Sequence, residues 1–332
     1  MSSPQDSIME VSRSAASSDE RMTSDAGEQR LPSGEEKDLT ETLERHRKAA
    51  EQGHADAQYK LGMCYHRGDG VEKDAIKALE WCRKAAEQEY ADAQTFLGMC
   101  YNFGFGCESD SAKSREWYCK AAEHYQAAAD KGDAEAQYKL SECYDMGHGV
   151  EKDAIKAMEW CRKAAEQGVA EAQYKLGFRY CCYRAEGENV GVECDMSKAI
   201  MWFRKAAEQG LAEAQNELAR RLQGGYGVKK DEEKAVEWLR KAAEQGHAEA
   251  QYSLGMCYRR GRGVDKDYAK SLEWLRKAVE QGHPRAQLEL GQCYIYGLGV
   301  EIDYKIAEKW FRKAMWLCDD AKVELCHMGL KP

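Results

Sequence analysis

One short motif recurs along this chain at nearly constant intervals. Ala-x-Ala-Gln occurs six times and Pro-Arg-Ala-Gln once, ending at Gln58, Gln94, Gln137, Gln173, Gln215, Gln251 and Gln287. Successive copies are 36, 43, 36, 42, 36 and 36 residues apart. One tryptophan per copy follows the same steps: Trp81, Trp117, Trp160, Trp202, Trp238, Trp274 and Trp310. Because a period of this size is typical of units that stack and share a core, the repeat predicts a solenoid.

Each copy has the pattern of two helices. In the first helix Ala57, Leu61 and Cys64 share one face, and Gly68 follows where a left-handed residue can end the helix. Asp74 has the position of an N-cap for a second helix, and an aspartate recurs there in every copy. The recurring tryptophan falls on the predicted buried stripe of that second helix. The sequence therefore predicts an all-α, right-handed α-solenoid of about seven helical hairpins of 36 residues.

The ends and two insertions depart from this pattern. Residues 1–37 are rich in serine and acids and hold no aromatic residue, which predicts a disordered tail. Residues 38–328 are expected to form the solenoid, with a half-unit cap at each end, and residues 329–332 a C-terminal tail. Seven extra residues around 124–131 predict a longer second helix, and six after Tyr180 predict a longer loop.

Charge and hydropathy exclude several classes of partner. The net charge of −9 and the pI near 5.6 argue against binding to nucleic acid or to anionic membranes. No apolar run approaches the roughly 20 residues of a membrane span, and the first residues lack the pattern of a secretory signal. We therefore expect a monomeric protein of the cytoplasm or nucleus that is not secreted and does not insert into a membrane.

The fourteen cysteines are predicted to be mostly free thiols. In one column of the second helix Cys82 and Cys161 stand where other copies have Tyr118, Phe203 or Leu239, as expected for a small core hydrophobe. A repeat family that is cross-linked by disulfides would carry a pair of cysteines in every copy. Reduced thiols also agree with an intracellular setting.

One group of metal-ligating residues stands outside the periodic pattern. Cys181, Cys182 and Cys194 lie in the fourth copy, and His148 lies in the preceding loop. Loops of neighbouring units stack, so a zinc site or a local disulfide are both open alternatives. The spacing contains no C-x-x-C core, so free thiols and no metal are the favoured interpretation.

The consensus A-x-x-x-L-G-x-x-Y-x-x-G-x-G-V-x-K-D-x-x-K-A-x-x-W-x-x-K-A-A-x-x-G resembles the Sel-one-like repeat family, relatives of the tetratricopeptide repeats. The resemblance covers about residues 38–328 and implies a superhelix that acts as a scaffold or adaptor. Some secreted, cysteine-rich members have been described as β-lactamases. Their bridging cysteines occupy columns that here hold Ala86 and Gln58 and their equivalents, which argues against disulfides and hydrolase activity.

No motif predicts catalysis. The loop G-D-G-V-E-K-D lacks the Gly-Lys-Ser/Thr ending of a phosphate-binding loop, and no serine lies in a nucleophile elbow. We therefore expect no enzyme activity and no cofactor.

The binding surface is predicted on the first helix of each unit. Positions equivalent to 56, 59, 63, 66 and 67 face away from the core, and they vary most between copies. Drift on an unused face is one explanation, but methionines and aromatic residues favour a concave face that binds a protein or peptide. The expected contacts are Tyr59, Met63, Arg67, Phe103, Tyr138, Glu142, Phe178, Arg220, Tyr252, Met256, Arg259, Arg260 and Tyr296.

The charge of this face suggests where a partner binds. Arg220, Arg259 and Arg260 predict an acidic partner segment against the C-terminal half. The leading hypothesis is a scaffold that holds an extended or helical segment. A self-assembling structural protein remains an alternative, and a β-lactamase-like hydrolase is a less favoured one.

Overall fold

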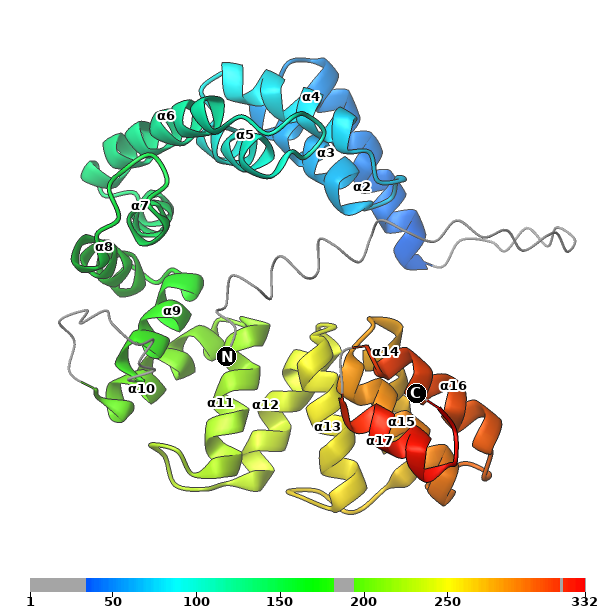
Figure 1. Cartoon of the computed structure of the whole chain (residues 1–332). Coiled ribbons are helices and arrows are strands. Elements are labelled where there is room, and N and C mark those ends of the chain that lie inside the picture. The colour runs from blue at the N-terminus through cyan, green and yellow to red at the C-terminus, as the bar shows by residue number, and fades with distance from the viewer. Residues whose placement is uncertain (1–33, 182–193, 317–318, 332) are drawn as a thin grey trace, which may run out of the picture.

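A computed structural model describes residues 34–181, 194–316 and 319–331. Within these ranges all regular structure is helical, in sixteen helices that follow one another around an open arc (Figure 1). The predicted all-α solenoid is confirmed. In the described part of the chain, no helix is both long and apolar enough to cross a membrane.

Seven helical hairpins make up the arc, with a single helix at each end. The end helices are α2 (Gly34–Glu51) and α17 (Asp319–His327). The hairpins are α3 (Ala55–Arg67) with α4 (Ala75–Glu87), α5 (Ala91–Phe103) with α6 (Ser111–Asp130), α7 (Ala134–Met146) with α8 (Ala154–Glu166), α9 (Ala170–Tyr180) with α10 (Met196–Glu208), α11 (Ala212–Gly224) with α12 (Glu232–Glu244), α13 (Ala248–Arg260) with α14 (Tyr268–Glu280), and α15 (Pro284–Tyr296) with α16 (Tyr304–Ala314).

The predicted helix caps are confirmed. Asp74 accepts hydrogen bonds from the backbone N–H groups of Ile76 and Lys77, at 3.1 and 2.9 Å, and each even-numbered helix from α6 to α16 has an aspartate in the same role. Gly68 ends α3 with φ of 85°, in the left-handed region where glycine avoids the Cβ penalty.

A glycine inside the first helix allows the two helices of a hairpin to approach. A Cβ on Gly62 would overlap Sγ of Cys82 and lie 3.0 Å from the carbonyl oxygen of Ala78. Gly98, at the same position in the next unit, faces the ring of Tyr118. The propensity cost of about 1 kcal/mol for a helical glycine is therefore offset by close contact.

The recurring glutamine joins three helices. Nε2 of Gln58 donates to the carbonyl oxygen of Ala50 in α2 at 3.2 Å, and its Oε1 accepts from Nε2 of Gln88 at the end of α4 at 2.7 Å. Equivalent glutamine pairs recur in four later units. In the second unit His124 replaces the second glutamine, and Oε1 of the buried Gln94 has no partner among the described residues. The motif thus satisfies a buried amide while it fixes the stacking of neighbouring units.

The first insertion lengthens one helix as predicted. α6 has 20 residues, whereas α4 and α8 have 13 each. Within the added turns Tyr125 is buried, and its hydroxyl donates to Oδ1 of Asp92 at 2.6 Å. Most of the second insertion and the first 33 residues lie outside the described residues. α2 begins at Gly34, four residues before the predicted start of the solenoid at Asp38.

The tryptophans differ from the expected buried stripe. Of the seven recurring tryptophans only Trp202 is buried, at 7% exposure, and the other six are half-buried. In each hairpin the lysine three residues later lies over the indole ring, as Lys84 does over Trp81 at 4.0 Å from the ring centroid. The ring therefore packs with one part on the core while another part contacts a cation near the surface.

Candidate functional site: the inner face of the arc

The two helices of a hairpin lie on different sides of the arc. In Figure 1 α3, α5, α7 and α9 line the inner side, whereas α4, α6 and α8 lie on the outer side. The positions predicted to face away from the core belong to these inner helices. The candidate site is therefore the inner face of the arc.

In the six inner helices of 13 residues the last residue is exposed to solvent and varies between units. We call this the rim position; in the described units it is held by Arg67, Phe103, Met146, Gly224, Arg260 and Tyr296. Phe103 is 55% exposed, Met146 64% and Tyr296 60%. Large apolar side chains are thus left in water at one recurring place. Four predicted site residues stand at the exposed rim, namely Arg67, Phe103, Arg260 and Tyr296.

In four units the preceding residue instead contacts the next inner helix. We call this the junction position; it is held by His66, Asn102, Asp145, Cys181, Gln223, Arg259 and Ile295. The ring of His66 lies edge-on to Phe96, with centroids 5.1 Å apart. Arg259 forms an ion pair with Glu289 and donates to Oε1 of Gln292 at 3.3 and 3.4 Å. Variation at this position therefore belongs largely to contacts between units.

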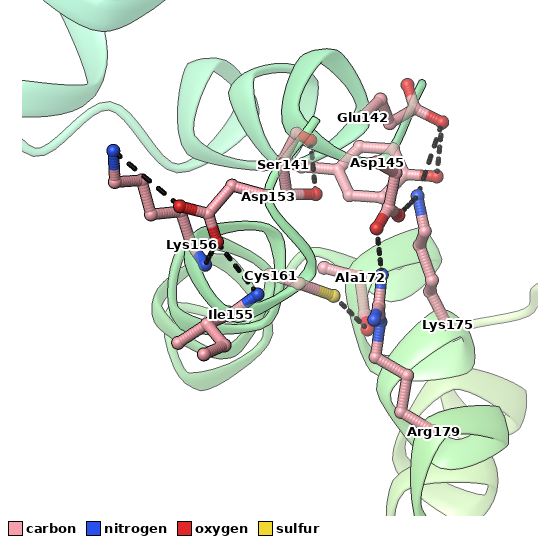
Figure 2. Close-up of polar contacts among 11 residues, drawn as sticks. Ser141, Glu142, Asp145, Asp153, Ile155, Lys156, Cys161, Ala172, Lys175 and Arg179 are labelled. Carbon is pink, nitrogen blue, oxygen red and sulfur yellow. Dashed lines mark hydrogen bonds and ion pairs between the residues drawn. The ribbon is translucent and has the colours of Figure 1, made fainter. Parts of the chain in front are cut away.

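The junction between α7 and α9 shows this most fully (Figure 2). Asp145 of α7 accepts from Arg179 and from Nζ of Lys175, the latter at 2.8 Å, both on α9. Burial alone would raise the pKa of Asp145, but the hydrogen bonds and charges of Arg179 and Lys175 outweigh it, so the pKa is lowered. Beside this cluster the hydroxyl of Tyr138 donates to Oε1 of Glu142 at 3.2 Å, and burial followed by the Glu142 charge raises the pKa of Tyr138.

Two predicted contacts are less accessible than expected. Met256 is only 8% exposed and packs with Leu272 and Leu290 in the core, so the expectation that it lies on the open face is wrong. Phe178 is half-buried between the rings of Tyr174 and Phe203, at centroid distances of 4.9 and 5.1 Å. Helical periodicity placed both residues on the inner side but did not show how far a neighbouring helix covers them.

The remaining apolar contacts are partly open. Tyr59 is half-buried against Tyr90, with ring centroids 5.4 Å apart, and burial raises its pKa to about 12. Tyr252 stacks on His283 at 4.8 Å and 22°. Met63 packs with the cluster of Cys82 and its neighbours. These side chains form the floor of the inner face.

Two of the three arginines expected to bind an acidic partner already form ion pairs within the chain. Arg259 already binds Glu289, and Arg220 donates to both carboxylate oxygens of Glu217 at 2.7 and 2.9 Å. The Arg220 side chain stays 56% exposed beside its partner, whereas that of Arg259 is 17% exposed. Arg260 remains exposed at the rim.

An acidic edge was missed in the sequence. The second residue of each inner helix from α3 to α13 is an acid, namely Asp56, Asp92, Glu135, Glu171, Glu213 and Glu249. It shares a helical stripe with the rim position. Burial, and then the charge of Glu171, raises the pKa of Glu135, which indicates that neighbouring acids repel one another. The sequence signal was one charge sign at a fixed position in six units.

The cysteines of the group outside the periodic pattern differ in oxidation state. Cys181 is a buried free thiol, but Cys194 is disulfide-bonded, so the interpretation of Cys194 as a free thiol is wrong. Cys182 lies outside the described residues. His148 stacks on Tyr118 with centroids 4.0 Å apart. No cluster of three or more metal-ligating side chains is found in the part of the chain that the structure describes.

Comparison with known proteins agrees with this architecture. The model of the Sel1 repeat matches residues 33–54, 55–90, 91–125, 120–133, 134–169, 170–211, 212–247, 248–283 and 284–314. The chain belongs to the Sel1 repeat family. The overlapping matches at 91–125 and 120–133 coincide with the lengthened α6. Sel1 repeat proteins are generally protein-interaction scaffolds and typically not enzymes.

Solved structures include several related proteins. A Sel1 repeat protein from Oxalobacter formigenes is 34% identical with a TM-score of 0.58, over 89% of this chain and 82% of that one. A protective antigen of uropathogenic Escherichia coli, which has the same type of repeat fold, is 33% identical over 83% of this chain and 72% of that one, with a TM-score of 0.39. An immunity protein from Pseudomonas aeruginosa is 22% identical over 70% and 82%, with a TM-score of 0.43. No curated protein matches the chain.

Proposed function

We propose that this Sel1 repeat protein is a non-catalytic scaffold whose inner face binds a segment of a partner protein. The observation that carries the proposal is the rim, where Phe103, Met146 and Tyr296 are each more than half exposed at one recurring position. Exposed apolar groups gathered on one face are typical of a binding surface. The core beneath them stays constant from unit to unit, so the rim is free to be specialised.

The acidic edge specifies the chemistry of the partner. Carboxylates recur at the opposite end of the inner helices from the rim, on the same helical stripe, in six successive units, and the net charge of the chain is −9. We infer that the bound segment presents apolar side chains to the rim and basic side chains to the acidic edge. Each exposed ion pair contributes only about 0.2–1 kcal/mol, so the apolar contacts dominate affinity and the charges favour approach and orientation.

A matched pair of substitutions tests this proposal. Phe103 on the inner side and Ile155 at the start of outer helix α8 are similarly exposed, at 55% and 60%. Peptides selected from a displayed library against the wild-type protein would be measured by fluorescence anisotropy against Phe103→Asp and Ile155→Asp. We expect the first substitution to weaken binding about tenfold, the cost of one contact of about 1.4 kcal/mol, and the second to leave it unchanged. Equal effects of the two changes would contradict the inner-face assignment.

The proposal also covers the cellular compartment and the oligomeric state of the protein. We propose a cytoplasmic monomer, supported by eleven free cysteines among the described residues. Sedimentation across a concentration range tests the monomer, since a self-assembling protein would show a rising mass. Mass spectrometry of protein alkylated at lysis tests the setting, because widespread disulfides would contradict it.

A further inference from the structure

The junctions between inner helices follow one geometric rule. The junction residue of one unit meets the sixth residue of the next inner helix, so that Asp145 lies against Lys175 and Arg259 against Glu289. The signs of the charges are opposite in the two cases, yet each pair is complementary. At these two junctions the charge is balanced across the junction, whereas Glu217 of α11 stands opposite Cys181 and is paired with Arg220 and Arg221 of its own helix.

The last junction has a carboxylate but no cation opposite it. Glu324 of α17 holds the position of Glu289, but the junction residue that faces it is Ile295 instead of an arginine. Oε1 of Glu324 accepts from Nε2 of Gln292 at 2.9 Å. Its Oε2 lies 3.9 Å from Nδ1 of His327, which is beyond hydrogen-bond distance. The side chain of Glu324 is 18% exposed, so a largely buried carboxylate keeps one oxygen without a close donor among the described residues.

A cavity opens beside this carboxylate. Its volume is about 320 Å³, and it is lined by Ile295, Tyr296, Tyr304, Glu324, His327 and Met328, from the ends of α15 and α17 and the start of α16. These helices lie together at the C-terminal end of the arc in Figure 1. The two tyrosines, each 60% exposed, supply aromatic surface, and Glu324 supplies the negative charge.

We propose that this pocket binds the guanidinium group of an arginine from a partner protein. The incoming side chain takes the role that Arg259 has at the preceding junction, where a carboxylate and a glutamine oxygen hold the guanidinium. Arginine fits better than lysine because its planar group donates to a carboxylate through two N–H groups and stacks on aromatic rings. That the arginine belongs to a protein rests on the proposed function, whereas the pocket's affinity for a guanidinium does not.

The pocket can be tested with a small probe and a local signal. The full chain would be labelled with ¹³C at the methionine methyl groups, with Met328→Leu to assign the Met328 signal. It would then be titrated with Nα-acetyl-arginine amide, and with the neutral isostere Nα-acetyl-citrulline amide as the control. We expect a saturable shift of the Met328 signal with the arginine probe and none with citrulline. The signal of Met63, which lies at the other end of the arc, should stay unchanged.

Two substitutions separate this pocket from general attraction to an acidic protein. Glu324→Gln keeps the shape and should weaken the probe about tenfold or more, since a charged hydrogen bond is lost, whereas Glu159→Gln at an exposed position of outer helix α8 should not. Ile295→Arg should place a guanidinium in the pocket from within the chain and so abolish the Met328 response, while Ile295→Met should preserve it. Equal responses to arginine and citrulline, or an unchanged response in Glu324→Gln, would overturn the proposal. A probe that binds here while selected peptides ignore Phe103→Asp would leave the pocket standing and reject the proposed function.

Discussion

The ion cluster between α7 and α9 should contribute several times more to the free energy of unfolding than an ion pair on the surface does. Asp145→Asn removes the carboxylate that holds Arg179 and Lys175, and the Asp145 and Arg179 side chains are each only 16% exposed. Removing one partner from a buried pair costs about 3–5 kcal/mol; because some solvent reaches this cluster, we expect about 3 kcal/mol. Asp56, whose pair with Lys60 is 58% and 53% exposed, is the control, and Asp56→Asn should cost about 1 kcal/mol or less.

Urea unfolding followed by circular dichroism measures both costs, and their pH dependence tests the cause. The pKa of Asp145 is lowered in the folded state, so its stabilising contribution is complete above the unfolded value of about 3.9 and declines as the pH falls toward the folded value. The cost of Asp145→Asn should therefore be constant from pH 7 to about 5 and shrink below that. A cost no larger than that of Asp56→Asn at pH 7, or one that does not shrink in acid, would refute the reasoning.

Three further outcomes follow from burial and backbone geometry. Leu239→Ala, at a position only 1% exposed, should destabilise by about 2–5 kcal/mol in the same urea assay, and a loss below about 1 kcal/mol would contradict the core. Under native conditions maleimide should modify the exposed Cys326 quickly and Cys161 slowly, since Cys161 is fully buried and burial raises its pKa to about 11; mass spectrometry of digests would show the order. Gly149→Ala should cost more in thermal unfolding than Gly168→Ala, because both glycines have positive φ but only at Gly149 would a Cβ overlap the backbone of the preceding outer helix.

The periodic part of this structure could be read from the sequence because it depends on local rules. An aspartate before a helix and a glycine after it act within a few residues, so the cap at Asp74 and the end at Gly68 were predicted correctly. The extension of α6 followed from counting residues between repeats. The half-burial of the tryptophans did not follow, since the depth of a ring depends on the neighbouring unit and on the lysine over it.

The candidate site was predicted less completely because helical periodicity gives direction but not coverage. Phe103 and Tyr296 lie open at the rim as expected, whereas Met256, on the same side of its helix, is covered by the next unit. Arg259 could not be recognised as occupied, because Glu289 lies 30 residues away in the sequence and meets it only through stacking. The acidic edge, in contrast, was readable as a column of one charge sign and was overlooked.

Sequence variation between repeats therefore has two different causes, one at the junction position and one at the rim position. At two junctions a change in one unit is matched by its neighbour across the interface, as the reversed charges of Asp145 with Lys175 and Arg259 with Glu289 show. Such compensated variation preserves stacking and says nothing about a partner. Among the described residues no hydrogen bond, ion pair or ring contact joins a rim side chain to the next unit, so variation at the rim is free to serve binding. Glu217 also has no cation across its junction but pairs with Arg220 and Arg221 of its own helix, whereas Glu324 faces Ile295 and has no arginine bound among the described residues, so the C-terminal end of the inner face is where an external arginine can contribute.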